Sequence, residues 1–356
     1  MTTPIIAFFN NKGGVGKTSL VYHLAWMYFD LGLQVVAADL DPQANLTAAF
    51  LDEDRLEEVW ESSNSNNYNT VFRCVRPLLS GIGDIATPNL EKIEDGLSLL
   101  IGDLQLSGFE DELSSQWSDC LDRKERAFRV ISAFWRVLSQ AASSTSADVV
   151  LVDLGPNLGA INRAALIASD YIIVPLSPDL FSLQGLKNLG PTVKRWREEW
   201  RERIPKNPAL DLALPQGKMQ PVGYVILQHG VRFDRPVKAF QRWIEKIPGI
   251  YREKVIENPK SDNEELTQKQ DEVALAPSSD PNRLALLKHY QSLMPMAQES
   301  RKPIFHLKPA DGAIGAHIDA VRLVYWDFKD LAQKIANRTE LLLPSSQSSL
   351  ELELKK

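Results

Sequence analysis

The chain has 356 residues, of which 44% are hydrophobic and 24% charged, and its formal net charge at pH 7 is −6. This length is enough to bury a large core, as one α/β domain or as one domain with additions. The acidic balance excludes an overall basic nucleic-acid-binding protein and leaves room only for a local basic patch. With two cysteines, no secretion signal and no apolar stretch as long as a membrane span, we expect a cytoplasmic protein without disulfides or a membrane partner.

Continuous apolar runs recur along the chain and alternate with stretches of helical periodicity. Runs of this kind are typical of strands that are buried on both faces, and hence of a mostly parallel sheet. The alternation predicts an α/β fold with a doubly wound sheet flanked by helices, in which ligands bind at the carboxyl ends of the strands. The expected strands are 5–9, 34–38, 97–101, 149–152, 171–176 and 222–227, and the expected helices are 17–31, 43–50, 121–142, 159–169, 183–203, 235–246 and 315–337.

Residues 11–19 follow the first expected strand and read Asn-Lys-Gly-Gly-Val-Gly-Lys-Thr-Ser. A strand, a glycine turn and a helix, in this order, form the context of a phosphate-binding loop. The glycines let backbone N–H groups point inward, and the helix N-terminus adds partial positive charge. The final lysine reaches the β- and γ-phosphates, and the threonine hydroxyl reaches Mg²⁺. The expected nucleotide-binding residues are Gly13, Gly14, Val15, Gly16, Lys17, Thr18 and Ser19.

A second lysine, Lys12, opens this loop, and Asn11 stands where the common phosphate-loop pattern has its first glycine. Lys-Gly-Gly-Val-Gly-Lys-Thr is the deviant phosphate loop of the ParA/MinD group of ATPases, which this chain resembles over about residues 3–338. The resemblance implies a P-loop NTPase fold and an ATP-bound homodimer. In that family the first lysine reaches across the dimer to the phosphates of the other subunit. By resemblance Lys12 would do so here, with Lys17 and Asp41 as the other catalytic residues.

Two further motifs place carboxylates at the ends of expected strands. Residues 39–43 read Asp-Leu-Asp-Pro-Gln and match the family's Asp-x-Asp-Pro-Gln motif. The resemblance implies that Asp41 orients or activates the attacking water and that Asp39 supports Mg²⁺ through water; helix capping is the alternative for an isolated aspartate. The strand that ends at Asp153 has the form of a Walker B element, which delivers a carboxylate to Mg²⁺. The expected metal-site residues are Thr18, Asp39 and Asp153.

The loop after Asp153 reads Leu-Gly-Pro-Asn-Leu-Gly and is similar to the family's Cys-Pro-Pro-Ser-Leu-Gly switch loop. Leu154 and Gly155 depart from that pattern, and the extra glycine should loosen the loop. Residues 174–186 resemble the family's entry to a dimer-facing helix, although a plain strand–turn–helix connection is the alternative. Gln228 lies where the family places adenine-recognition residues. Because no Asn-Lys-x-Asp guanine motif is present, ATP is expected rather than GTP.

Basic residues gather in two expected helices and beside a C-terminal Lys-Pro-Ile stretch. Such patches could bind DNA phosphates without reading the base sequence, and a solvated helix face with i,i+4 ion pairs is the alternative. ParA proteins usually place a DNA-binding arginine shortly before the Lys-Pro-Ile stretch, whereas this chain has Leu293 there. The candidate DNA-binding residues are Lys194, Arg195, Arg197, Arg201, Arg235, Arg301 and Lys302.

The sequence therefore predicts a single ParA-like ATPase domain over 1–340, with an enlarged, partly polar excursion around 230–300 and a polar tail over 341–356. By resemblance, Mg-ATP would drive dimerisation, and hydrolysis would be slow without a stimulating adaptor protein. The dimer would segregate or position DNA or another large cargo through non-specific DNA binding, in the cytoplasm and in association with the nucleoid. One alternative is a dimer that regulates a protein effector. Another is a MinD-like membrane switch, which the proline and the period-two pattern of the tail disfavour.

Overall fold

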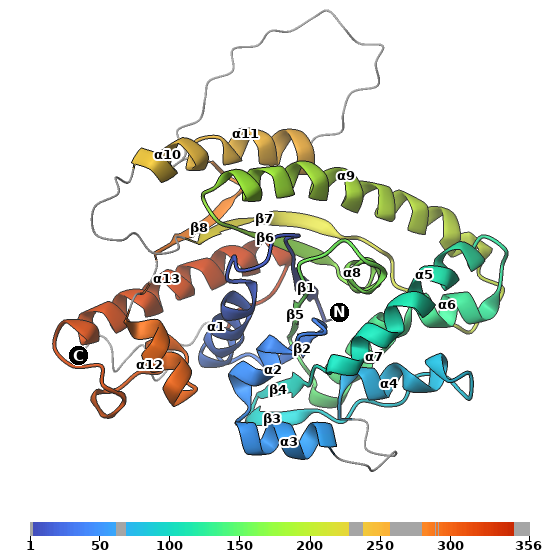
Figure 1. Cartoon of the computed structure of the whole chain (residues 1–356), viewed down its shortest axis with the longest axis horizontal. Coiled ribbons are helices and arrows are strands. Elements are labelled where there is room, and N and C mark those ends of the chain that lie inside the picture. Colours follow the sequence, from blue (N-terminus) through green and yellow to red (C-terminus); the bar gives the residue numbers. More distant parts are fainter. Residues whose placement is uncertain are drawn as a thin grey trace, which may run out of the picture.

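In the computed structural model an eight-stranded sheet runs through the centre of the molecule (Figure 1). The structure describes residues 3–61, 69–227, 238–256, 280–288, 290 and 292–344, and the strand count refers to these ranges. The strand order is β3-β4-β2-β5-β1-β6-β7-β8, and every pair is parallel except β3 with β4. The strands are β1 Ile5–Phe8, β2 Val35–Asp39, β3 Glu91–Glu94, β4 Leu97–Leu100, β5 Val149–Asp153, β6 Tyr171–Leu176, β7 Gln220–Leu227 and β8 Arg283–Leu287.

Helices cover both faces of the sheet, and β1 shows how the core divides between them. Ile5 and Ala7 belong to the apolar cluster of one face, and Ile6 and Phe8 to that of the other, because successive side chains of a strand point to opposite faces. The first face carries α4 Val71–Leu79, α5 Glu110–Asp119, α6 Glu125–Ile131, α7 Ala133–Thr145, α8 Ala160–Ile167, α9 Leu180–Arg203 and α11 Ile247–Tyr251. The second carries α1 Lys17–Asp30, α2 Asn45–Phe50, α3 Glu53–Glu61, α12 Leu293–Ser300 and α13 Ala316–Thr339.

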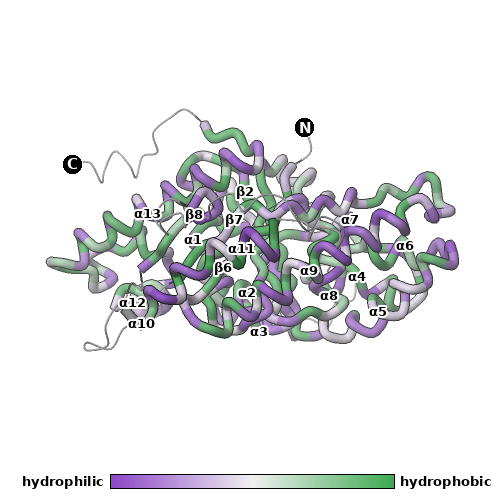
Figure 2. Tube along the Cα trace, turned by 90° about the horizontal axis from the view of Figure 1, so that it is seen from above, coloured by the Kyte–Doolittle hydropathy of each residue, from purple (hydrophilic) through white to green (hydrophobic). Residues whose placement is uncertain are grey.

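Hydrophobic residues are frequent along the central strands, and hydrophilic residues are commoner in the surrounding helices (Figure 2). This agrees with central strands that are buried on both faces: all residues of β1, β2, β5 and β6 are buried. The fold class predicted from the apolar runs, a doubly wound and mostly parallel sheet flanked by helices, is thereby confirmed. Trp196 and Trp200 of α9 are buried core residues. Among the described helices, none has both the length and the apolar character that crossing a membrane would require.

All six expected strands are present, whereas several elements differ from the expectation. The helix expected at 121–142 is wrong: α5 ends at Asp119, Arg123 adopts a left-handed backbone with φ 60°, and α6 and α7 follow. The edge strand β3 was not predicted, because its sequence Glu-Lys-Ile-Glu has one apolar residue and its side chains are at least partly exposed. Strand β8 was not predicted either, since it lies inside the excursion expected to be partly polar. The expected helix 235–246 corresponds to α10 Lys238–Ile244, whereas α3, α4, α5, α11 and α12 lie outside the expected helices.

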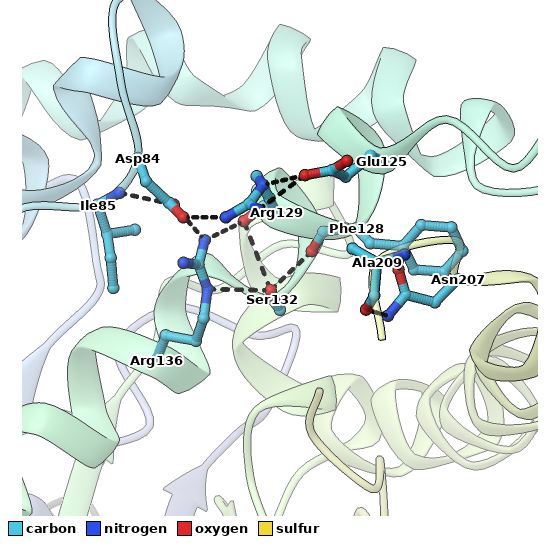
Figure 3. Close-up of polar contacts among 9 residues, drawn as sticks. All are labelled: Asp84, Ile85, Glu125, Phe128, Arg129, Ser132, Arg136, Asn207 and Ala209. Atoms are coloured by element: carbon cyan, nitrogen blue, oxygen red, sulfur yellow. Dashed lines mark hydrogen bonds and ion pairs between the residues drawn. The ribbon is translucent and has the colours of Figure 1, made fainter. Parts of the chain in front are cut away.

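A network of ion pairs fastens the loop after α4 to the junction of α6 and α7 (Figure 3). Asp84 binds the guanidinium groups of Arg129 and Arg136, with a distance of 2.7 Å from its Oδ1 to Arg136 Nη2. The Arg136 Nε donates to Ser132 Oγ at 3.2 Å, and this hydroxyl donates to the Phe128 carbonyl at 2.6 Å. Arg129, Ser132 and Arg136 therefore hold the junction between the two helices together with Asp84, which comes from a loop distant in sequence.

Candidate functional site

The carboxyl ends of β1, β2 and β5 meet at one edge of the sheet. Asp153 is the register partner of Phe8 on one side and of Asp39 on the other. The loop that follows β1 therefore leaves the sheet beside the two carboxylates that end the neighbouring strands. This is the place where an open parallel sheet binds its ligand.

The phosphate-loop residues form a tight turn between β1 and α1. Gly14 and Gly16 have φ values of 71° and 88°, a left-handed backbone that a side chain would strain. Asn10 is buried and donates through Nδ2 to the Pro175 carbonyl at 2.7 Å, which ties the start of the loop to the end of β6. Val15 is fully buried. The turn is therefore anchored at its base and in its middle, while Gly13 and Gly14 stay exposed to a ligand.

Lys17 begins α1 and is buried, with 7% of its surface exposed. Burial lowers the pKa of its ammonium group, and the nearby carboxylates of Asp153 and Asp41 oppose this effect. Its Nζ lies 3.4 Å from the Lys12 carbonyl oxygen across the loop. A cation held in this position, with its charge only partly compensated, is suited to bind phosphate oxygens.

Asp153 and Thr18 form the centre of the candidate metal site. The Thr18 hydroxyl donates to Asp153 Oδ2 at 2.7 Å, while Asp153 Oδ1 is buried and has no hydrogen-bond partner in the described structure. Burial and the adjacent Asp39 raise the pKa of Asp153, so a cation at this point would relieve the cost of its charge. Among the described residues, no group of three or more His, Cys, Asp or Glu side chains is arranged to hold a metal ion by itself. The residues therefore fit Mg²⁺, which takes few protein oxygens and fills its shell with phosphate and water.

Both carboxylate oxygens of Asp39 accept hydrogen bonds from the protein, and its support of Mg²⁺ through water stays a prediction. Its Oδ2 accepts hydrogen bonds from the Thr47 backbone N–H and hydroxyl, both at 2.8 Å, and its Oδ1 accepts one from the Asp41 N–H at 3.2 Å. Thr47 also accepts a hydrogen bond from the Gly102 N–H at 2.8 Å. Burial raises the pKa of Asp39. In this arrangement Asp39 orients α2 and the backbone of Asp41, and its oxygens already have partners inside the protein.

Asp41 lines the cavity beside the phosphate loop and is 6% exposed. Its Oδ1 accepts a hydrogen bond from the Gln43 N–H at 3.0 Å. This bond closes a turn over Pro42 and holds the carboxylate toward the cavity. A carboxylate in this place is able to orient a water molecule against a phosphate bound by the loop.

Lys12 forms an ion pair with Asp179, the residue that caps the N-terminus of α9. Asp179 Oδ1 accepts from the Ser182 N–H at 2.9 Å, and its Oδ2 binds the Lys12 ammonium. The ammonium also lies 5.9 Å from the centroid of the Phe181 ring. Leu180 and Phe181 are 54% and 72% exposed, so an apolar surface adjoins the lysine.

A cavity of about 750 Å³ extends from the phosphate loop toward the C-terminal elements. At that end it is lined by Leu287, Tyr290, Met294 and Phe328, among others. These residues were not predicted as site residues, because the sequence around them carries no motif. Their apolar and aromatic character suits a nucleobase. Gln228, the predicted adenine contact, lies outside the described residues.

His23 joins the phosphate-loop helix to this C-terminal wall. Its Nε2 accepts a hydrogen bond from the Ile304 N–H at 3.2 Å, so Nδ1 carries the proton that it donates to the Ser19 carbonyl at 2.7 Å. Burial lowers the pKa of His23 to about 4, so the ring stays neutral at pH 7. The two walls of the cavity are thus bonded through one buried side chain.

The candidate DNA-binding residues lie in different environments. Arg197 is half-buried and donates to the Met219 carbonyl, a contact that joins α9 to the segment before β7, and its role as a DNA contact stays a prediction. Lys302 lines the nucleotide cavity and pairs with Asp311 at 2.7 Å. Lys194 and Arg195 lie near Glu198 and Glu199 in i,i+4 pairs, at 4.0 and 3.8 Å. Arg201 and Arg301 are exposed, and Arg235 lies outside the described residues.

A protein-family profile described as an AAA domain matches residues 3–206, more than half of the chain. The matched range contains the phosphate loop, Asp41 and Asp153. The chromosome partitioning protein ParA of Caulobacter vibrioides is 26% identical to this chain over 200 residues, which is 56% of this chain and 66% of that protein. The chain belongs to the ParA/MinD-type ATPase family.

A second relative and one solved structure are also similar to this chain. The sporulation initiation inhibitor protein Soj of Bacillus subtilis is 28% identical over 190 residues, which is 53% of this chain and 64% of Soj. The chain thus matches less than two thirds of the length of this curated relative. A putative plasmid partition protein of Borrelia burgdorferi, bound to AMPPNP, shares the fold with a TM-score of 0.53 and 17% identity, over 95% of this chain and 99% of that one.

Proposed function

We propose that this protein is an ATPase switch that binds Mg-ATP, dimerises and thereby positions DNA or another large cargo in the cytoplasm. The observation that carries the proposal is that Lys17, Thr18 and Asp41 line one cavity beside the phosphate loop, and that the buried Asp153 lies behind Thr18 and accepts a hydrogen bond from its hydroxyl. In this proposal residues 13–19 bind the phosphates, and Thr18 and Asp153 hold Mg²⁺, which would neutralise phosphate charge. Asp41 orients the attacking water.

The dimer belongs to the same proposal. Lys12, at the start of the phosphate loop, lies beside the exposed Phe181, which Leu180 precedes, and these residues form a surface that a second copy would cover. Release of Lys12 from Asp179 would let its ammonium group reach phosphates bound by the partner subunit. Burial of the phosphates between two copies would exclude water and strengthen each charge contact. Hydrolysis, stimulated by an adaptor protein, would dissolve the dimer.

The Lys17→Ala substitution tests nucleotide binding. Because Lys17 is the buried cation beside the phosphate loop, we expect the affinity for a fluorescent ATP analogue to fall at least about 100-fold, the loss of one charge-assisted contact or more. Lys206→Ala is the matched control, since Lys206 pairs with Glu202 at 3.1 Å at the end of α9. Equal affinity of the Lys17→Ala and control proteins would refute the assignment of the site.

A second candidate function is a nucleotide-controlled dimer that regulates a protein effector. The observation that favours it is the internal use of basic side chains on α9. Arg203 is 5% exposed and donates to the Trp117 carbonyl at 3.0 Å, and Arg197 is also hydrogen-bonded inside the fold. The basic surface left for DNA is therefore smaller than the sequence suggested.

A further inference from the structure

Asn162, on the first turn of α8, holds the loop that follows Asp153. Its Nδ2 donates to the Gly155 carbonyl at 2.9 Å and to the Asn157 carbonyl at 2.7 Å. The side chain is 1% exposed, and its own oxygen is buried without a hydrogen-bond partner. An unpaired buried acceptor destabilises the folded state. The hydrogen bonds that the NH₂ group donates must therefore stabilise the fold by more than the unpaired oxygen destabilises it.

The orientation of the amide follows from its partners. The amide faces the carbonyl oxygens of Gly155 and Asn157 and, at 3.0 Å, the side-chain oxygen of Asn157, and all three of these atoms accept hydrogen bonds. Only the NH₂ group is able to donate to them. Asn162 therefore acts as a clamp that draws together the two ends of the segment 155–157.

The helix that carries the clamp is itself fixed. Glu110, at the start of α5, accepts hydrogen bonds from the Ala160 N–H at 2.5 Å and the Ile161 N–H at 2.8 Å. A carboxylate at a helix N-terminus also interacts favourably with the helix dipole. A Cβ atom on Gly159 would lie 2.5 Å from Glu110 Oε1, so a side chain at this position would displace the carboxylate. Asn162 consequently reaches the loop from an anchored position.

The clamped loop touches the catalytic side of the cavity. A Cβ atom on Gly155 would lie 3.1 Å from Asp41 Oδ1, and Pro156 lines the cavity next to Gly13. The loop therefore lies between Asn162, which donates to Gly155 and Asn157, and the residues Asp41 and Gly13 of the cavity. Any shift of the segment 155–157 would change the space around the Asp41 carboxylate.

We propose that Asn162 is a positioning residue for ATP hydrolysis, which acts by clamping the loop 155–157 against Asp41 and the phosphate loop. This inference rests on the proposed function. The extra glycine at 155 gives the loop freedom that a clamp must limit. Asn162 would thus affect the step that depends on the γ-phosphate and the attacking water, and leave binding of the other phosphates to residues 13–19.

The test compares wild type with Asn162→Leu, which keeps the branched shape of the side chain and removes both N–H donors. We expect single-turnover ATP hydrolysis to slow about tenfold or more, as for other misplaced catalytic groups. The affinity for a fluorescent ADP should change less than about twofold, a difference of under 0.5 kcal/mol. Asn162→Gln, which retains the NH₂ group, should recover part of the rate. If the leucine variant does not fold, Asn162→Ala provides the same comparison.

Ser169→Ala is the matched control, because the buried Ser169 hydroxyl donates to the Ala165 carbonyl at 2.8 Å at the opposite end of α8. This variant should keep both the hydrolysis rate and the ADP affinity. An Asn162→Leu protein that hydrolyses ATP at the wild-type rate, or that loses ADP affinity as much as rate, would overturn the positioning role. A wild-type protein that binds neither nucleotide would instead refute the proposed function.

Discussion

At the scale of single residues, threonine side chains hold two of the carboxylates of the site in place: Thr18 donates to Asp153 and Thr47 to Asp39. Both oxygens of Asp39 accept hydrogen bonds from Thr47 or the Asp41 backbone, whereas Asp153 Oδ1 has no hydrogen-bond partner among the described residues. Two adjacent aspartates at strand ends therefore have different surroundings. The difference arises because Thr47 is within reach of one carboxylate and Thr18 of the other.

The Asp179→Asn substitution tests whether the Lys12 ion pair restrains dimerisation. Asparagine keeps the helix cap, since it accepts the same N–H as aspartate, but it loses the charge that holds Lys12. A partly exposed pair contributes about 0.5–1 kcal/mol, so we expect ATP-dependent dimer formation to become roughly two- to fivefold more favourable per protomer. Analytical ultracentrifugation with a non-hydrolysable ATP analogue measures this.

The control for this variant is Asp179→Ala, which removes the ion pair together with the cap of α9. It should lower the free energy of unfolding by about 1 kcal/mol, whereas Asp179→Asn should not. Weaker dimerisation of Asp179→Asn would mean that Asp179 supports the dimer instead of restraining Lys12.

At the scale of elements, junctions between helices depend on contacts that local sequence does not show. Asp84 pairs with Arg129 of α6 and with Arg136 of α7 from a loop 45 or more residues away. The periodicity of residues 121–142 predicts one helix and carries no signal for the boundary between α6 and α7. The phosphate loop, by contrast, could be predicted because its glycines and its lysine lie within one short segment.

The Asp84→Asn substitution should give a stability defect that depends on pH. Burial opposes the charge of Asp84, but hydrogen bonds from Arg136, the Ile85 N–H and Arg129 outweigh it and hold the pKa of the carboxyl below its usual range. A lowered pKa in the folded state stabilises the protein above the unfolded pKa of about 4, and this stabilisation is lost as the pH falls through the folded value.

We therefore expect urea unfolding at pH 7 to show a free energy of unfolding about 1 kcal/mol lower in Asp84→Asn than in wild type, a value reduced by solvent screening. The difference should shrink below about pH 4. Asp330→Asn is the control, because Asp330 pairs with Lys334 on an exposed face of α13. A defect of equal size at pH 7 and pH 3 would contradict the electrostatic explanation.

At the scale of the whole molecule, the cavity joins two parts of the chain that are far apart in sequence. The family match ends at residue 206, whereas Tyr290, Met294 and Phe328 line the far end of the cavity. The bond between His23 and Ile304 spans 281 residues, and the Tyr28 hydroxyl donates to Ala332 in α13. The sequence predicted the phosphate end from motifs, but it could not predict this other wall, whose residues are defined only by packing.

DNA binding by the ATP-bound protein distinguishes the two candidate functions. Asp41→Ala should retain ATP, because residues 13–19 still bind the phosphates, and should accumulate as an ATP dimer, because hydrolysis is blocked. If the exposed Arg201 and Arg301 form a DNA-binding surface of this dimer, fluorescence anisotropy with random duplex DNA will show binding with ATP and not with ADP. Binding should weaken steeply with salt, since phosphate contacts release counterions.

Charge reversal separates the two candidate functions. Arg201→Glu in the Asp41→Ala background should weaken DNA binding, while Lys206→Glu, at a position paired with Glu202, serves as a control of equal charge change on the same end of α9. Equal loss in both variants would indicate a general effect of net charge, because the protein is already acidic. A protein that is dimeric with ATP and binds no DNA would mean that the dimer acts on a protein partner. The internal hydrogen bonds of Arg197 and Arg203 would then explain why α9, despite its basic sequence, offers little to DNA.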